Sequence, residues 1–173
     1  GYHEVHDQSG SPDGTHPLEY RNYDIVNNSW GWTEAFGDNF HEFENVETLY
    51  FFQTTMLGRD GLGTIMIFSA GNERQEGGSS DVNSWSNNEF VITVGGINKQ
   101  TDIGNLELYQ SPFSNPGPNI LISAPASNIS STMYESENSN GSTFGSQNEM
   151  SNGTSFAAPI VSGVVALMLE ANS

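Results

Sequence analysis

Two hydroxyl residues near the end of the chain lie where their chemistry can be used. Gly153, Thr154 and Ser155 come shortly before an apolar stretch at 160–171, which predicts a buried helix. A serine at the start of a helix either caps the free N–H groups of the first turn or acts as a nucleophile, helped by the partial positive charge of that helix end. A lone serine in this setting is usually a cap, so the choice depends on the rest of the sequence.

Two other segments carry groups that could serve the same chemistry. Asn72 follows the apolar run 64–70 and a glycine. An asparagine in such a place is ordinarily a turn residue, but its neutral amide can also donate a hydrogen bond to a developing negative charge. The tripeptide Ser29-Trp30-Gly31 ends a short apolar stretch, and its tryptophan belongs either to the core or to a substrate cleft.

The composition limits the class of protein. The chain has 173 residues, which is one domain or a large piece of one, and 35% of them are hydrophobic. Its 21 acidic and 4 basic residues give a formal charge of −17, which repels nucleic acid and anionic lipid and excludes both as partners. No apolar run approaches the roughly 20 residues of a membrane span. The absence of cysteine excludes a disulfide scaffold and thiolate chemistry.

Apolar runs and glycine-rich breaks predict the elements that hold these residues. Strands are expected at 24–31, 64–70, 90–96 and 119–125, and the last three are continuous enough to be covered on both faces. A helix is expected at 41–57, with an apolar face and glycines ending it. The residues of this face are Phe43, Val46, Tyr50 and Leu57, flanked by Leu49 and Phe52. Residues 1–22 are predicted to be an irregular surface segment, and 126–151 an exposed excursion. This alternation favours an α/β fold with a mainly parallel sheet flanked by helices.

Three segments together resemble the subtilisin-like serine peptidases. They are the nucleophile segment at 152–168, the segment of the oxyanion-hole asparagine at 67–72, and the substrate-binding strand edge at 27–31. The stretches 90–98 and 111–125 are similar to the strand and turn that precede the nucleophile loop of this family. Their order and approximate spacing agree over 24–172, and the Ser-Trp-Gly tripeptide resembles the kexin and furin branch.

The resemblance assigns a role to each group. It implies that Ser155 is the nucleophile and that Asn72, with the Ser155 backbone N–H, forms the oxyanion hole. It also implies that the substrate backbone pairs as an added strand with Ser29, Trp30 and Gly31. Ala70 and Gly71 are then expected to help wall the primary pocket.

Two parts of the family's catalytic triad have no counterpart. The family has an aspartate after an early strand and a histidine in a His-Gly-Thr stretch, both before the Ser-Trp-Gly segment. The nearest imitations, at 7–10 and 13–16, lie too close together and are interpreted as turns. The four histidines are interpreted as surface residues: His3, His6, His16 and His41.

The chain is therefore expected to be the C-terminal part of a catalytic domain over 1–173, incomplete without an N-terminal portion. A preceding fragment of the same enzyme would supply the aspartate and histidine, and without them the serine is a poor nucleophile. A catalytically inactive, subtilase-like binding module is the first alternative. An acidic calcium-binding secreted domain with a coincidental motif is the second. An Asp-x-Gly and a His-Gly-Thr upstream would decide for the enzyme.

The expected reaction needs no cofactor and acts on a polypeptide. Family resemblance and the absence of cysteine favour a secreted, extracellular protein. A structural calcium ion is compatible with the resemblance and with the surplus of carboxylates, but no segment has a dedicated ligand spacing, so no metal ligands are assigned.

Primary specificity has two interpretations. In the kexin and furin branch, acidic residues near the Ser-Trp-Gly segment and the oxyanion asparagine attract a basic side chain. Glu34 and Asp81 occupy comparable places here and would favour Arg or Lys. However, Trp32 stands where that branch usually has proline, and an acidic chain places a carboxylate near any site by chance. A broad or apolar preference is the alternative.

Overall fold

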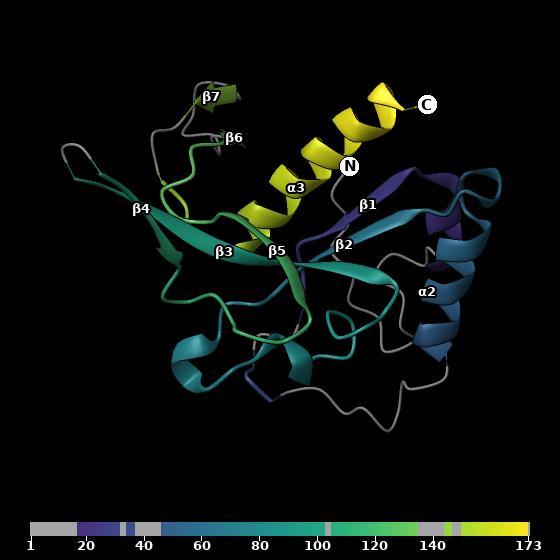
Figure 1. Ribbon diagram of the computed structural model, residues 1–173, viewed down its shortest axis with the longest axis horizontal. Coiled ribbons are helices and arrows are strands. Elements are labelled where there is room, and N and C mark those ends of the chain that lie inside the picture. Colours follow the sequence, from purple (N-terminus) through teal and green to yellow (C-terminus); the bar gives the residue numbers. More distant parts are fainter. Residues whose placement is uncertain are drawn as a thin grey trace, which may run out of the picture.

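A single sheet with one α-helix on each face forms the framework of the protein (Figure 1). The structure is a computed structural model that describes residues 17–31, 34–36, 46–102, 105–134, 144–146 and 150–172. The predicted α/β fold with a mainly parallel sheet is confirmed.

Four of the five strands of this sheet are parallel. They are β1 (Ile25–Asn28), β2 (Ile65–Ser69), β3 (Val91–Asp102) and β5 (Ile120–Pro125). β3 is longer than the run at 90–96 predicted. Its first part pairs with β2, and its second part pairs antiparallel with β4 (Asn105–Gln110), which the sequence reasoning missed. The short strands β6 (Thr132–Tyr134) and β7 (Phe144–Ser146) form a separate antiparallel pair within the predicted excursion.

Alternating side chains of β2 face the two helices. Met66 and Phe68 pack with Phe51 of α2 (Val46–Leu57) on one face of the sheet. Ile67 points to the opposite face, where it packs in the cluster that contains Val161 of α3 (Thr154–Ala171). Side chains that alternate in this way along a strand bury both faces of the sheet, as the continuous apolar run predicted.

The predicted apolar face of α2 was wrong in detail. Phe51 is buried, whereas Leu57 is exposed, because the sheet decides which side of the helix is covered. The predicted glycine stop is confirmed: the Gly58 N–H donates to the Thr54 carbonyl oxygen at 3.0 Å, and the Gly63 N–H donates to the Gly58 carbonyl oxygen at 2.8 Å. The first residues of the predicted helix, 41–45, lie outside the described residues.

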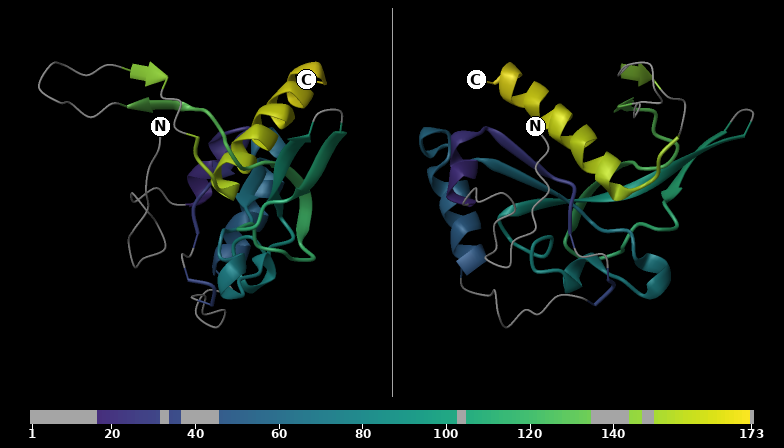
Figure 2. Two further views of the ribbon diagram at one scale, coloured as in Figure 1. Left: turned by 90° about the vertical axis from the view of Figure 1, so that its left-hand side faces the viewer. Right: turned by 180° about the vertical axis from the view of Figure 1, so that it is seen from behind.

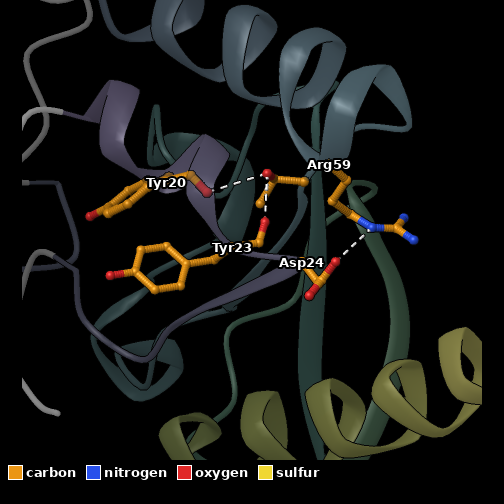
Figure 3. Close-up of polar contacts among 5 residues, drawn as sticks. Tyr20, Tyr23, Asp24 and Arg59 are labelled. Atoms are coloured by element: carbon orange, nitrogen blue, oxygen red, sulfur yellow. Dashed lines mark hydrogen bonds and ion pairs between the residues drawn. The ribbon is translucent and has the colours of Figure 1, made fainter.

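Polar contacts join the entry to β1 with the entry to β2. The Thr64 hydroxyl lies 2.8 Å from the Tyr23 carbonyl oxygen and 3.2 Å from that of Tyr20, the latter in the 3₁₀ helix η1 (Pro17–Asn22). Arg59 Nε donates to Asp24 Oδ1 at 3.0 Å (Figure 3). Of the irregular segment predicted at 1–22, residues 1–16 lie outside the described residues.

The helix α3 is buried only near its start. Ala157 and Ala158 are fully buried, and their small side chains let the first turns lie close to the sheet. Farther along, Val164, Leu167 and Met168 are exposed, and the C-terminal end of α3 points away from the sheet (Figures 1 and 2). The expectation of a wholly buried helix was therefore wrong for the described residues.

α3 is long and apolar enough to cross a membrane by length and composition alone. One such helix is weak evidence that the protein spans a membrane, because the core helix of a soluble protein has the same properties.

The strand β5 is less covered than predicted, with 73% of Leu121 exposed.

Candidate active site

The start of α3 is held by an asparagine from a distant segment. Asn72 follows β2, and its Oδ1 accepts hydrogen bonds from the Thr154 backbone N–H at 2.8 Å and from the Thr154 hydroxyl at 3.0 Å. The first N–H groups of a helix have no partners within the helix, so Asn72 serves as a cap supplied from outside. The Thr154 hydroxyl also accepts a hydrogen bond from the Gly71 N–H at 3.2 Å.

These contacts fix the orientation of the Asn72 amide. Because Oδ1 faces two donors of Thr154, the NH₂ group is the one turned toward the space beside Gly153. The position that a Cβ on Gly153 would occupy lies 3.7 Å from Asn72 Nδ2 and 3.8 Å from the Ser155 backbone nitrogen. Two hydrogen-bond donors thus flank one small space, which a side chain at position 153 would fill. This arrangement can stabilise an oxygen that acquires negative charge.

Gly153 also has a conformation that suits glycine. Its φ is +151°, in the region where a side chain is strained. Its N–H donates to the Ala126 carbonyl oxygen at 2.8 Å, and its own carbonyl accepts from the Phe156 N–H at 3.0 Å. The chain therefore turns sharply into α3 and leaves the Asn72 amide uncovered.

Ser155 and Ser29 bond to each other reciprocally. The Ser155 hydroxyl donates to the Ser29 carbonyl oxygen at 3.2 Å, and the Ser29 hydroxyl donates to the Ser155 carbonyl oxygen at 2.9 Å. Within the described residues, no acidic side chain bonds to the Ser155 hydroxyl. All four histidines and the imitations of triad motifs at 7–10 and 13–16 lie outside the described residues.

Two residues that the sequence reasoning missed hold the Asn72 loop. Glu73 Oε2 accepts hydrogen bonds from the Asn72 backbone N–H at 2.8 Å and from Asn115 Nδ2 at 2.9 Å. The Asn115 backbone N–H donates to the Gly71 carbonyl oxygen at 3.0 Å. Gly71 has a φ of +92°, and a Cβ there would lie only 2.4 Å from Asn115 Nδ2. The sequence did offer one signal, because Glu73 directly follows Asn72, a candidate anion-binding residue. A carboxylate at that position is unfavourable unless nearby N–H groups donate hydrogen bonds to it.

The other residues predicted for substrate binding differ in their exposure. The Trp30 side chain is 37% exposed, and its ring packs edge-on against Trp85 at 4.6 Å and Phe68 at 5.4 Å between centroids. Gly31 is exposed beside Trp30. Ala70 is buried, and its N–H donates to the Val94 carbonyl oxygen at 3.0 Å.

The two acids predicted for a basic pocket make no described bond to the residues of this centre. Glu34 is exposed, and Asp81 lies in the 3₁₀ turn η4 (Ser80–Val82), where its carboxylate accepts a hydrogen bond from the Ser79 hydroxyl. Among the described residues, no hydrogen bond or ion pair joins either acid to Ser155 or Asn72. The same part of the chain holds no cluster of three or more metal-ligating side chains of His, Cys, Asp or Glu.

Comparisons with known proteins identify the family of the chain. The model of the Subtilase family, Peptidase S8, matches residues 13–173. Human furin is 30% identical over 128 residues, which are 70% of this chain and 14% of furin. The extracellular basic protease of Dichelobacter nodosus is 36% identical over 110 residues, which are 64% of this chain and 16% of that protein.

The fold is that of a solved peptidase. The serine protease of Aeromonas sobria superposes with a TM-score of 0.63 at 19% identity, over 88% of this chain and 31% of that one. The chain thus spans about a seventh of the length of the furins it matches and about a third of this solved structure. The predicted subtilisin-like fold and the kexin and furin character are confirmed.

The hydroxyl of Thr154 gives a direct test of how the helix start is held. Thr154→Val removes the hydroxyl and leaves the Gly71 N–H without its acceptor, so the free energy of unfolding should fall by about 1–3 kcal/mol. Thr154→Ser keeps the hydroxyl and should cost clearly less. Urea denaturation of the intact protein measures both. A valine variant as stable as the wild type would show that these hydrogen bonds do not hold the site.

Proposed function

Because the chain belongs to the subtilase family, we propose that it carries the nucleophile, the oxyanion hole and one side of the substrate cleft of a secreted serine endopeptidase. The observation that supports this most is the small space beside Gly153, which Asn72 Nδ2 and the Ser155 N–H both flank. A helix cap alone does not require an amide group turned toward a neighbouring serine. The cap and the donor here are the two ends of one side chain.

In the proposed reaction, Ser155 Oγ attacks the carbonyl carbon of the scissile peptide bond. The carbonyl oxygen becomes an oxyanion and accepts hydrogen bonds from Asn72 Nδ2 and the Ser155 N–H. A histidine, oriented by an aspartate, takes the Ser155 proton and passes it to the leaving amine. Water then attacks the acyl-enzyme by the same route in reverse and restores the Ser155 hydroxyl. No cofactor takes part in these steps.

The substrate would lie along the segment that follows β1. Ser29, Trp30 and Gly31 continue from this strand, and an extended peptide can pair with their backbone as an added strand. The Ser29 carbonyl oxygen accepts a hydrogen bond from the Ser155 hydroxyl here, and a substrate N–H would replace this hydroxyl as the donor. Trp30, which packs against Trp85, and the backbone of Ala70 and Gly71 would form the walls of the primary pocket.

The missing histidine and aspartate are proposed to come from a preceding fragment of the same enzyme. Exposed apolar side chains on α3 and β5 support this, because a patch of this kind is normally covered; they are Ile160, Val164, Leu167, Met168, Leu121 and Ile122. The small share of each relative that the chain spans supports the same proposal. A binding module that has lost its base is the alternative.

Two attributes of the whole protein are part of the proposal. Secretion is supported by one relative, the extracellular basic protease of Dichelobacter nodosus. A structural calcium ion is supported only by the surplus of carboxylates, and the ion would serve stability rather than the reaction.

Covalent labelling tests the nucleophile. In the intact enzyme, a fluorophosphonate probe should attach to Ser155, because this serine has the proposed oxyanion hole beside it, and Ser155→Ala should abolish both labelling and peptide hydrolysis. Mass spectrometry of the labelled peptide identifies the residue. Labelling of another serine would overturn the assignment, and an intact protein that neither reacts nor hydrolyses peptides would favour the binding module.

Loss of the amide donor tests the oxyanion hole. Asn72→Ala should lower kcat by about 10²- to 10³-fold, the loss that removing one such donor causes in a subtilisin, with little change in KM. The bond strengthens only in the transition state, which is why the two constants should respond differently. Asn22→Ala, at an exposed position in η1, is the matched control. An unchanged kcat in a folded Asn72 variant would remove this residue from the site.

Cleavage of a peptide library distinguishes the two specificities. Because neither acid bonds to the catalytic centre and Trp30 is an apolar wall, we expect a broad or apolar preference at the residue before the scissile bond. Glu34→Gln and Asp81→Asn should then leave kcat/KM for Leu and Arg substrates in the same ratio. A strong preference for Arg that either variant weakens would instead assign the acids to a basic pocket.

A further inference from the structure

Pro159 leaves the carbonyl group of the nucleophile without its normal partner. In an α-helix the carbonyl of residue i accepts the N–H of residue i+4, so the Ser155 carbonyl would accept from position 159. Proline has no N–H, and its ring crowds the carbonyl four residues before it. Because Pro159 lies inside α3, the carbonyl that lacks a helical N–H donor is that of Ser155.

The Ser29 hydroxyl supplies the missing donor. It donates to the Ser155 carbonyl oxygen at 2.9 Å, from a segment 126 positions earlier in the chain. Its direction is set from the other side, because Asn27 Nδ2 donates to the same Ser29 oxygen at 3.0 Å. Asn27 Oδ1 in turn accepts a hydrogen bond from the Ser162 hydroxyl of α3 at 3.1 Å. The Ser29 proton is thereby turned toward Ser155.

We propose that the Ser29 side chain is a positioning residue for the nucleophile. Its hydroxyl replaces the N–H that Pro159 lacks, and so fixes the backbone of Ser155 at the mouth of α3. This role rests on the proposed function of Ser155, and it is separate from the backbone of Ser29, which would pair with substrate. The hydroxyl of Ser29 takes no part in the chemical steps.

A double-mutant cycle on the intact enzyme tests the proposal. Ser29→Ala should lower kcat and the rate of fluorophosphonate labelling about tenfold, as expected for one partly buried carbonyl left unpaired, with KM unchanged because the backbone remains. Ser29→Thr keeps the hydroxyl and should restore most of the rate. Pro159→Ala returns the helical N–H, so in that background Ser29→Ala should cost less than about threefold. Ser130→Ala, an exposed serine, is the matched control.

Two results would overturn this proposal, and a different result would refute the proposed function of Ser155. Pro159 is exposed and alanine favours helices, so the Pro159→Ala variant should fold. An equal cost of Ser29→Ala in both backgrounds would overturn the proposal, as would a loss of thermal stability with an unchanged labelling rate. Activity retained by Ser155→Ala would instead refute the proposed function, so the two failures are distinguishable.

Discussion

The site depends on one hydrogen-bonded contact, between the amide oxygen of Asn72 and the first residue of α3. Gly153 precedes that residue and has no side chain to cap the helix, and a side chain there would fill the space between Asn72 Nδ2 and the Ser155 nitrogen. The cap must therefore come from elsewhere, and Asn72 supplies it from 82 positions earlier in the chain. The contact that caps the helix thus also fixes the direction in which the Asn72 NH₂ group points.

The remaining structure keeps the two ends of this contact in place. The Asn72 loop directly follows β2, and Ile67 of β2 belongs to the same buried cluster as Ala157 and Ala158 of α3. Because protein interiors are closely packed, a shift of α3 against β2 would disturb both the core and the cap. Glu73 holds the other side of the loop through the Asn72 backbone N–H. On the far side of α3, the exposed apolar residues form the face that the proposed preceding fragment would cover.

The sequence predicted what is encoded locally and missed what depends on tertiary packing. The apolar runs of β2 and the residues Gly153–Ser155 are local signals, and the structure places Asn72 against Thr154, next to Ser155. β4 was missed because it has no continuous apolar run: Leu106 and Leu108 alternate with polar residues. The role of Glu73 was missed because only the folded loop brings N–H groups to its carboxylate.

A structure of the intact enzyme bound to a peptidyl phosphonate tests the central claim most directly, which is that the oxyanion hole is already formed before substrate binds. The account predicts a covalent bond from Ser155 Oγ to phosphorus. It also predicts a phosphonyl oxygen about 2.7–3.1 Å from both Asn72 Nδ2 and the Ser155 nitrogen, with Asn72 Oδ1 still on Thr154. An Asn72 side chain that has left Thr154, or an adduct on a different serine, would contradict it.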